Sequence, residues 1–377
     1  MADVNFMRLA LRLARRGLGA TSPNPMVGAV LVKRGKIIGQ GWHRQAGEPH
    51  AEIEALNDAR ARGHEVKGST LYGTLEPCST HGRTPPCTEA IKAAGIKKVV
   101  AGATDPNPAH AGRGFGILKR AGIEVVHGVL AEEVTRLNEA FNHWIVRRTP
   151  FVTVKAAMTL DGKIATARGE SKWITGTKAR ACGLALRQST DAVLVGINTV
   201  LADDPSLTAR KIQGSKSKIP NPKRRIVLDS QARTPLDSQV VSDKHAGWTT
   251  IVVSKQAAKA RVAALEKRVR VIIAPTITAK EKDAEPRIDL RWLLKKLGAE
   301  QVTGLLVEGG GEVNASFLLG GLAQRVAFFY APKILGGRDA RKGVGGRGVQ
   351  SVAEMIRLQE VGWRWLGPDL LLTGRVS

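Results

Sequence analysis

The sequence predicts an α/β fold in two domains. Short runs of Val, Ile and Leu alternate with Ala-rich stretches of helical period, aromatic residues make up only 4% of the composition, and glycine occurs 41 times. A chain of 377 residues is long for one hydrophobic core and suits two domains. These observations favour sheets covered by helices over a β-sandwich or a coiled coil.

The first half begins with an amphipathic pattern that predicts a helix at residues 3–17. Pro49 stands just before a second helical pattern, where proline is tolerated, so His50 and Glu52 are expected in the first turn of that helix. A turn at residues 33–36 joins two strands into a hairpin. The elements expected here are strands at 27–32, 37–41, 69–74, 97–102 and 124–128 and helices at 50–62, 87–94 and 114–121.

Residues 141–151 are predicted to contain the domain boundary. They include Arg147-Arg148-Thr149-Pro150, in which the proline ends a helix and the charges keep the segment in water, so we place the boundary between residues 147 and 148. Beyond it, alternating strands and helices favour a mixed or parallel sheet with crossover helices. The elements expected there are strands at 152–157, 192–196, 225–228, 249–253, 269–273 and 304–307 and helices at 176–188, 290–297 and 313–319.

Composition also limits the setting and the partners. Only Cys78, Cys87 and Cys182 occur, so no disulfide framework is expected, and no apolar run is long enough to cross a bilayer. A cytoplasmic location is expected. The formal net charge of +25 attracts phosphates of any kind, from nucleic acid to small metabolites. Lys and Arg are densest at 211–225, where no aromatic residues are interleaved, and a solvated loop is expected there.

The residues His50, Cys78 and Cys87 form a candidate zinc site. An imidazole and two thiolates hold zinc with one position open for water, and the metal lowers the pKa of that water. Glu52 is expected to shuttle protons, because zinc nucleobase deaminases combine a His-x-Glu element with a Pro-Cys element and use the glutamate as general acid and base. The alternative is that His50 caps a helix and the cysteines are buried apolar residues.

The spacing of the two cysteines bears on the substrate. In nucleic-acid deaminases two residues separate them, whereas here eight residues, 79–86, intervene. Gly82 and the prolines allow this insert to fold back as a loop, so both thiolates still reach one metal. The insert is therefore expected to contact the substrate.

A glycine run, Gly309-Gly310-Gly311, is expected between a strand and a helix in the second half. Bare backbone amides and a helix N-terminus favour a phosphate at such a turn. The run matches neither the GxGxxG fingerprint nor the P-loop, so a simple tight turn explains it equally well.

Motifs spread over nearly the whole chain share one pattern. In the first half they are Pro23-Asn24-Pro25 with Val27-Gly28, Gly41-Trp42-His43, Ala46-Gly47-Glu48-Pro49-His50-Ala51-Glu52, Thr74-Leu75-Glu76-Pro77-Cys78, Gly82-Arg83-Thr84-Pro85-Pro86-Cys87 and Asp105-Pro106-Asn107-Pro108. In the second half they are Lys155, Leu160-Asp161-Gly162-Lys163, Gly169-Glu170-Ser171, Trp173-Ile174-Thr175, Thr199-Val200-Leu201-Ala202-Asp203-Asp204-Pro205 and Glu308-Gly309-Gly310-Gly311. With these motifs the chain closely resembles the bifunctional deaminase/reductases of riboflavin biosynthesis.

The resemblance implies two catalytic domains. Residues 1–147 would form a zinc-dependent, cytidine-deaminase-like domain with helices packed on a mixed sheet, and residues 148–377 an NADPH-dependent α/β domain that looks like dihydrofolate reductase. The implied substrate is a ribosylated diaminopyrimidinone 5'-phosphate. Water activated by zinc adds to the ring carbon bearing the 2-amino group, Glu52 passes the proton to the nitrogen, and ammonia leaves. NADPH then reduces the ribosyl group to a ribityl chain.

For the deaminase, the family's zinc ligands match His50, Cys78 and Cys87, and its proton shuttle matches Glu52. Considered alone, a histidine such as His43 is typical of a partly buried position, and loop residues of these types are typical turn formers or solvated charges. The positions that the resemblance places in the pyrimidine and ribose-phosphate pocket are Asn24, His43, Arg83, Asp105 and Asn107.

For the reductase, Lys155 and Glu308 are the candidate catalytic residues that position or polarise the sugar; a strand-end lysine and a helix-proximal carboxylate are the alternative. Arg187 and Arg210 suit a phosphate, because a guanidinium offers paired donors. The matched substrate positions are Ser171, Arg187, Leu207, Arg210 and Glu308. The matched cofactor positions are Ala157, Trp173, Thr199, Asp203, Ser230, Gly310, Gly311, Glu312, Val313, Asn314, Ala315 and Ser316.

The sequence departs from the family pattern at a few positions. Ser22 and Thr80 stand where histidine is common, and neither position is a zinc ligand. Gln324-Arg325 replaces a common acidic pair, which puts local packing or subunit contacts in question.

Two other functions stay open on the sequence. The first is a tRNA or DNA deaminase with an accessory phosphate-binding domain, which the charge favours and which the cysteine spacing and the lack of an aromatic stripe oppose. The second is a non-catalytic phosphate-binding protein with a structural zinc, although such a site normally has four protein ligands. The expected partners are a small phosphorylated pyrimidine and further copies of the chain, in a dimer or tetramer, with neither nucleic acid nor membrane.

Overall fold

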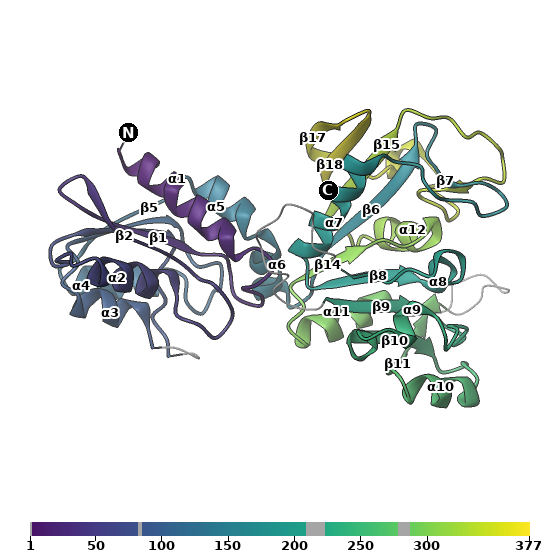
Figure 1. Ribbon diagram of the computed structural model, residues 1–377, viewed down its shortest axis with the longest axis horizontal. Coiled ribbons are helices and arrows are strands. Elements are labelled where there is room, and N and C mark those ends of the chain that lie inside the picture. Colours follow the sequence, from purple (N-terminus) through teal and green to yellow (C-terminus); the bar gives the residue numbers. More distant parts are fainter. Residues whose placement is uncertain (1, 82–84, 209–222, 278–286) are drawn as a thin grey trace. The chain divides into compact units, whose positions relative to one another are not determined.

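The computed structural model describes residues 2–81, 85–208, 223–277 and 287–377. The chain divides into two compact units, Met1–Arg148 and Thr149–Ser377 (Figure 1). This division lies one residue after the boundary placed on the sequence. Each unit is a sheet covered by helices, so the predicted α/β class is confirmed. In the described part of the chain, every helix is too short or too polar to span a membrane.

The first unit is built on a five-stranded mixed sheet with the order β2-β1-β3-β4-β5. Strand β1 runs antiparallel to both neighbours, whereas β3, β4 and β5 are parallel. The strands are β1 (Gly28–Lys33), β2 (Lys36–Trp42), β3 (Thr70–Leu75), β4 (Lys98–Ala103) and β5 (Glu124–His127). The helices are α1 (Ala2–Ala14), α2 (Ala51–Ala61), α3 (Cys87–Ala93), α4 (Arg113–Arg120), α5 (Ala131–Leu137) and α6 (Glu139–Arg147).

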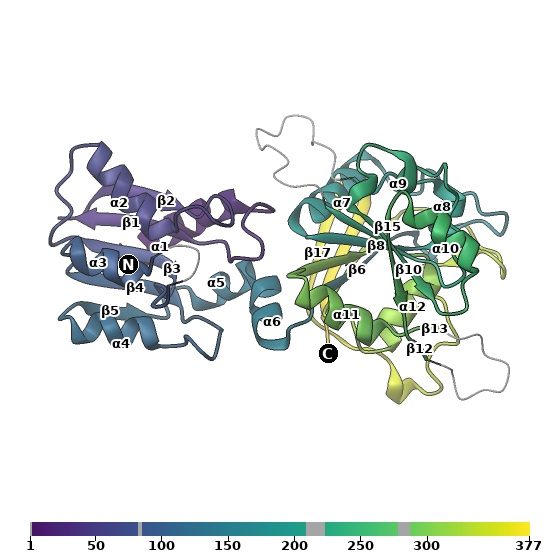
Figure 2. The ribbon, with the colours of Figure 1, turned by 90° about the horizontal axis from the view of Figure 1, so that it is seen from below.

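Both faces of this sheet are covered, as the apolar runs require. Side chains alternate across a strand, so Leu31 packs with α2, α3 and α4, while Val30 and Val32 pack with α1 on the opposite face. Figures 1 and 2 show α1 and α5 on one side of the sheet and α2, α3 and α4 on the other. The second group of helices positions the candidate zinc ligands.

Several local expectations for this unit are wrong. The first helix ends at Ala14 and continues as a 3-10 turn, Arg15–Gly17. His50 is the extended residue before α2, with φ −71° and ψ 163°, so only Glu52 lies in the first turn. Helix α5 was not predicted at all. Leu130, which precedes it, has a left-handed backbone (φ 57°), a conformation that leucine rarely adopts and that sequence therefore does not signal.

The second unit contains a nine-stranded sheet with the order β11-β10-β9-β8-β14-β6-β15-β18-β17. All neighbours from β11 to β15 are parallel, and β15, β18 and β17 are antiparallel. The strands are β6 (Phe151–Thr159), β8 (Ala192–Gly196), β9 (Arg224–Leu228), β10 (Thr249–Ser254), β11 (Arg270–Ala274), β14 (Gly304–Val307), β15 (Arg325–Ala331), β17 (Leu358–Leu366) and β18 (Asp369–Val376). Short pairs are formed by β7 (Lys163–Ala165) with β16 (Arg341–Lys342) and β12 (Thr276–Ile277) with β13 (Arg287–Ile288).

Helices cover both faces of the parallel part of this sheet. Helices α11 and α12 pack on one face, with Val152 and Val154 of β6, and α8, α9 and α10 pack on the other, with Val193 and Val195 of β8. Helix α7 packs against Phe329 of β15. The helices are α7 (Thr177–Ser189), α8 (Ile197–Asp203), α9 (Gln239–Ser242), α10 (Lys259–Glu266), α11 (Leu290–Ala299) and α12 (Gly311–Leu319).

Gln324 and Arg325, which replace the acidic pair common in the family, both contact neighbouring residues. The side-chain oxygen of Gln324 accepts a hydrogen bond from the backbone N–H of Val152 at 2.8 Å, and the guanidinium of Arg325 lies 5.6 Å from the ring centre of Phe151. The pair therefore joins β15 to the start of β6. The three strands β15, β17 and β18 themselves were not predicted.

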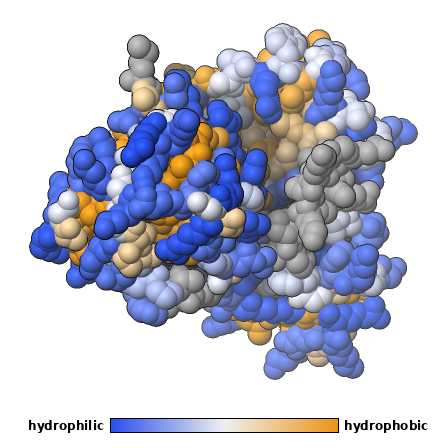
Figure 3. All heavy atoms as spheres, turned by 60° about the vertical axis from the view of Figure 1, so that its left-hand side comes forward, coloured by the Kyte–Doolittle hydropathy of each residue, from blue (hydrophilic) through white to orange (hydrophobic). Residues whose placement is uncertain are grey.

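The solvated loop expected at 211–225 is only partly testable, because residues 209–222 lie outside the described part of the chain. For the last residue of this segment, Arg225, the expected solvated loop is wrong. Arg225 belongs to β9 and is 1% exposed, and it donates to both carboxylate oxygens of Asp243. Hydrophilic residues nevertheless cover most of the face drawn in Figure 3, as the high charge leads one to expect.

Candidate active sites

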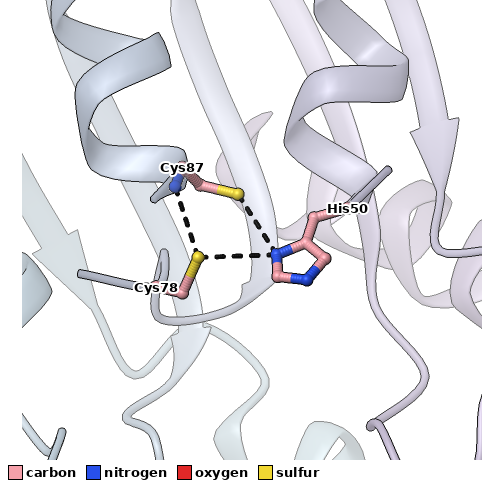
Figure 4. Close-up of side chains that lie close together, drawn as sticks. All are labelled: His50, Cys78 and Cys87. Atoms are coloured by element: carbon pink, nitrogen blue, oxygen red, sulfur yellow. Dashed lines mark hydrogen bonds between the residues drawn. The ribbon is translucent and has the colours of Figure 1, made fainter. Parts of the chain in front are cut away.

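The three candidate zinc ligands come together in the first unit (Figure 4). His50 precedes α2, Cys78 follows β3, and Cys87 is the first residue of α3. Nδ1 of His50 lies 3.4 Å from Sγ of Cys78 and 3.3 Å from Sγ of Cys87. The insert of residues 79–86 thus returns the second cysteine to the first.

The donor set fits zinc. Nitrogen and sulfur ligands at their usual zinc distances, in a tetrahedron, lie about 3.5 Å apart. The hydrogen bond between the two cysteines lowers the pKa of Cys78 and raises the pKa of Cys87, since it favours a thiolate at Cys78 and a thiol at Cys87. The Cys78 sulfur also accepts a hydrogen bond from the backbone N–H of Cys87 at 3.2 Å. A metal cation would hold both sulfurs as thiolates.

Glu52 lies beside this cluster and is 4% exposed. Burial raises the pKa of Glu52, and the nearby sulfur of Cys78 raises it further. A raised pKa makes a buried carboxyl group a better proton acceptor than an exposed one. The structure thus places Glu52, the predicted proton shuttle, beside the candidate ligands.

His43 and Asn24 form a hydrogen-bonded pair behind His50. The carbonyl of Pro49 can only accept, so Nδ1 of His43 donates to it at 3.1 Å, and Nε2 accepts from the amide of Asn24 at 3.1 Å. Burial lowers the pKa of His43, which keeps the ring neutral. The edge of one imidazole meets the face of the other, with 5.4 Å between the centres of the His43 and His50 rings. His43 thus supports the residue next to a candidate ligand.

Asp105 and Asn107 lie on one loop after β4. The backbone N–H of Asn107 donates to Oδ1 of Asp105 at 2.9 Å, and that of Ala109 donates to Oδ1 of Asn107 at 3.1 Å. Burial raises the pKa of Asp105. These hydrogen bonds give the loop a defined shape. Arg83, predicted with them, lies outside the described residues.

The second unit contains a cavity of about 630 Å³. It opens at the carboxyl ends of β6, β8 and β14, which is where open parallel sheets bind their ligands. The predicted residues that line it are Lys155, Ala157, Ser171, Trp173, Arg187, Thr199, Asp203, Leu207, Glu308, Gly310 and Asn314.

Three charged residues meet in this cavity. Nε and Nη2 of Arg187 donate to the two carboxylate oxygens of Glu308 at 2.7 and 2.8 Å, and Nζ of Lys155 lies 3.7 Å from Oε2 of Glu308. Burial raises the pKa of Glu308, but the positive charges of Lys155 and Arg187 outweigh burial and hold this pKa at about 2. Glu308 is therefore an anion throughout the physiological range of pH.

A second group of predicted residues also lines the cavity. The hydroxyl of Ser171 donates to Oδ1 of Asp203 at 2.9 Å. Trp173 is 67% exposed, and the centre of its ring lies 4.7 Å from the guanidinium of Arg180. An exposed aromatic ring beside a cavity offers a flat apolar surface to a planar ligand.

The glycine run fits a dinucleotide cofactor. A side chain on Gly309 would meet Val313 at 2.4 Å and one on Gly311 would meet the carbonyl of Lys342 at 2.3 Å, whereas Gly310 has open space. The run leads into the N-terminus of α12, which favours phosphate. Asn314 is fully buried and its side-chain oxygen has no hydrogen-bond partner among the described residues, so an acceptor is left for a ligand.

Several predicted cofactor positions do not line the cavity: Ser230, Gly311, Glu312, Val313, Ala315 and Ser316. Instead, Glu312 accepts from the backbone N–H of Gly346 at 3.0 Å, and the Ser316 hydroxyl donates to the carbonyl of Glu312. The carbonyl of Ser230 accepts from Ser254. Arg210 lies outside the described residues.

Other lining residues were not predicted as site residues, among them the polar residues Lys172, Arg180 and Gln239. Lys172 stands between two predicted positions, so adjacency was an available signal. Gln239 donates to Oδ1 and to the carbonyl of Asp204, which is 35 positions away. No local pattern indicates a contact of that kind.

Comparisons with known families agree with this arrangement. Residues 1–103 match the cytidine and deoxycytidylate deaminase zinc-binding region, and residues 150–372 match the RibD C-terminal domain. Riboflavin biosynthesis protein RibD of Actinobacillus pleuropneumoniae is 44% identical over 99% of this chain and 95% of its own length. The RibD of Escherichia coli K12 is 39% identical over 99% of both chains.

Solved structures give the same result. Acinetobacter baumannii RibD, form 1, superposes with a TM-score of 0.87 at 36% identity, over 100% of this chain and 99% of the other. The diaminohydroxyphosphoribosylaminopyrimidine deaminase/5-amino-6-(5-phosphoribosylamino)uracil reductase of Thermotoga maritima gives 0.82 at 36% identity, with the same coverage. The chain therefore belongs to the RibD family of bifunctional riboflavin biosynthesis enzymes, with a zinc-dependent deaminase region and an NADPH-dependent reductase domain.

Proposed function

We propose that the chain converts a ribosylated diaminopyrimidinone 5'-phosphate in two steps, with each step assigned to one cluster of side chains. The observation that carries the proposal is the presence of both clusters in one chain. His50, Cys78 and Cys87 surround a metal position next to Glu52, and the cavity of the second unit holds Lys155 and Glu308.

In the deaminase step, His50, Cys78 and Cys87 hold zinc. The chemistry that zinc supplies when bound is Lewis acidity, which lowers the pKa of water. Glu52 takes the proton from the attacking water and returns it to the departing nitrogen, and ammonia leaves. The pyrimidine and its ribose phosphate are contacted by Asn24, His43, Arg83, Asp105 and Asn107.

In the reductase step, the side chains of the cavity orient the sugar. The chemistry that NADPH supplies when bound is hydride transfer. Because Glu308 is ionised and already held by Arg187, it acts as an acceptor, and the ammonium of Lys155 donates to the ribose oxygen as the ring opens. Nη1 of Arg187, which makes a long hydrogen bond of 3.5 Å to the carbonyl of Thr208, is assigned together with Arg210 to the substrate phosphate.

We assign several residues that line the cavity to NADPH binding. Gly310 and Asn314 would contact NADPH at the start of α12, Thr199 and Asp203 would contact it from α8, and Trp173 from the loop before α7. Ala157 of β6 also lines the cavity. The positions that do not line the cavity, Glu312 among them, would act by shaping this wall.

The test follows the two steps separately. Purified protein is incubated with the diaminopyrimidinone ribosyl phosphate, and ammonia release and NADPH oxidation are recorded independently. Glu52→Gln is expected to stop ammonia release while the deaminated product, supplied directly, is still reduced. Unchanged ammonia release in this variant would rule out the proton-shuttle role. RNA that outcompetes the small substrate would instead favour the nucleic-acid deaminase.

We further infer a cytoplasmic homo-oligomer, a dimer or tetramer. Strand β17 is at the edge of the nine-stranded sheet and exposes Val361, Trp363 and Trp365 along one side, with 45%, 59% and 72% of each residue exposed. Alternate apolar residues on an edge strand suit pairing with a second copy. Light scattering of Trp365→Lys checks this, since a mass that stays at the wild-type oligomeric value would exclude β17 as the interface.

A further inference from the structure

Glu76 has a chemical role that its motif does not reveal. It follows β3 immediately, two positions before the candidate ligand Cys78, and is 5% exposed. Among the described residues no ion pair reaches it. Its carboxylate is surrounded by backbone N–H groups instead.

The two carboxylate oxygens of Glu76 accept hydrogen bonds from two different segments. Oε2 accepts from the N–H groups of Asp105 and Gly112 at 3.1 and 2.9 Å, which are the two ends of the loop after β4. Oε1 accepts from the N–H groups of Gly114 and Phe115 at 2.9 and 3.3 Å, in the first turn of α4. A carboxylate at a helix N-terminus also interacts favourably with the helix dipole.

Two glycines, Gly112 and Gly114, allow the backbone to approach the Glu76 carboxylate. A side chain at Gly114 would lie 2.2 Å from the carbonyl of Pro77, so only glycine lets α4 approach the turn that holds Glu76. Gly112, just before α4, has a left-handed backbone with φ 75°. Both glycines therefore serve the approach of the loop and helix to one carboxylate.

The loop closed by Glu76 carries Asp105 and Asn107, which the proposed function assigns to the substrate. The side chains of these two residues are used within the loop, where each accepts a backbone N–H two positions further on. The loop is thus internally ordered, and Glu76 fixes both of its ends to the turn that leads to Cys78. Catalysis requires substrate to be held within a fraction of an ångström of the reacting group.

We propose that Glu76 is a positioning residue of the deaminase, which holds the loop 105–112 at a fixed place relative to Cys78. It acts through Asp105 and Asn107 and does not touch substrate. This inference rests on the proposed substrate contacts of that loop.

The primary variant is Glu76→Gln. An amide has the same shape but only one acceptor oxygen, so its NH2 group must face two N–H donors in either orientation. We expect KM for the deaminase substrate to rise about tenfold or more, with kcat changed by less than about threefold, because substrate placement is lost while the metal and Glu52 remain. Glu76→Asp keeps the charge and all acceptor sites on a shorter stem and should give an intermediate KM.

The bifunctional chain provides its own controls. NADPH oxidation with the deaminated substrate and zinc content per chain should both equal the wild-type values in Glu76→Gln. Glu132→Gln, an exposed carboxylate of α5, should leave KM unchanged. Asn107→Ala should raise KM by a similar factor, since it removes the proposed contact itself.

The possible outcomes either support or contradict the positioning role of Glu76. A raised KM in Glu76→Gln and Asn107→Ala, with zinc and reductase activity intact, supports the proposal. An unchanged KM in Glu76→Gln overturns it, as does a loss of kcat that parallels a loss of zinc, which would make Glu76 a support of the metal site alone. A wild-type chain that releases no ammonia would sink the proposed function instead.

Discussion

Arg187 and Glu308 are 121 positions apart in the sequence and form a paired ion contact in the cavity of the second unit, with two N–H donors of the guanidinium on the two carboxylate oxygens. Nζ of Lys155 lies 3.7 Å from the same carboxylate. The three residues come from α7, the end of β14 and β6, so the contact exists only when the parallel sheet is complete.

Glu308→Gln should abolish most reductase activity and leave ammonia release unchanged. A neutral amide cannot neutralise the positive charges of Lys155 and Arg187. Removal of one partner from a buried ion pair also lowers the free energy of unfolding by about 3–5 kcal/mol. NADPH oxidation and urea unfolding measure the two effects. Glu266→Gln, an exposed carboxylate on α10, is the matched control, and a fully active Glu308→Gln would show that the carboxylate is dispensable.

The same residue predicts an acid-dependent stability. The pKa of Glu308 is about 2 in the folded chain, below its value of about 4.3 in an unfolded chain. A depressed pKa contributes stability that is present above about pH 4 and is lost as the pH falls towards about 2. Urea unfolding at pH 5 and pH 3 should show a smaller difference for Glu308→Gln than for the wild type. An equal difference would mean that other carboxylates account for the acid sensitivity.

Zinc removal should separate the two activities. The candidate ligands His50, Cys78 and Cys87 all belong to the first unit, whereas the cavity with Lys155 belongs to the second. Dialysis against a chelator is expected to stop ammonia release and to preserve NADPH oxidation with the deaminated substrate. Added zinc should restore the first activity. Loss of both activities on chelation would show that the metal also supports the second unit.

The glycine run offers a comparison of neighbouring positions. Gly311→Ala should destabilise the second unit, because the new methyl would lie 2.3 Å from the carbonyl of Lys342. Gly310→Ala has open space on its protein side and should keep the wild-type melting temperature while weakening NADPH binding. Thermal unfolding and NADPH titration distinguish them. Equal NADPH affinity in Gly310→Ala and the wild type would place the cofactor elsewhere.

Arg225→Met should lower the free energy of unfolding by about 3–5 kcal/mol, because the variant leaves Asp243 and several buried acceptors without their donor. Arg225 also donates to the carbonyl of Ser206, which lines the cavity, so NADPH oxidation should fall as well. Arg268→Met, at an exposed position, should change stability by less than about 0.5 kcal/mol. Equal stabilities of the two variants would contradict the role assigned to the buried guanidinium.

The sequence alone indicated the α/β class, the two-domain division and the residue types for zinc chemistry. These features are local: His50 and Glu52 are two positions apart, and Cys78 directly follows a proline and a strand. Alternating apolar residues likewise record burial on two faces of a strand. The strands β15, β18 and β17 at one side of the sheet were missed, although residues 326–331 form an apolar run like those of the buried parallel strands.

Contacts between groups far apart in the sequence form only in the folded chain. Arg187 faces Glu308, Gln239 holds Asp204, and Glu76 gathers four backbone N–H groups from residues 105–115. Such contacts depend on the order of strands in a sheet and on the path of the loops, which no local pattern records. The residue types of this chain therefore predict its chemistry. Which of those residues lie close together depends on how the strands, helices and loops pack.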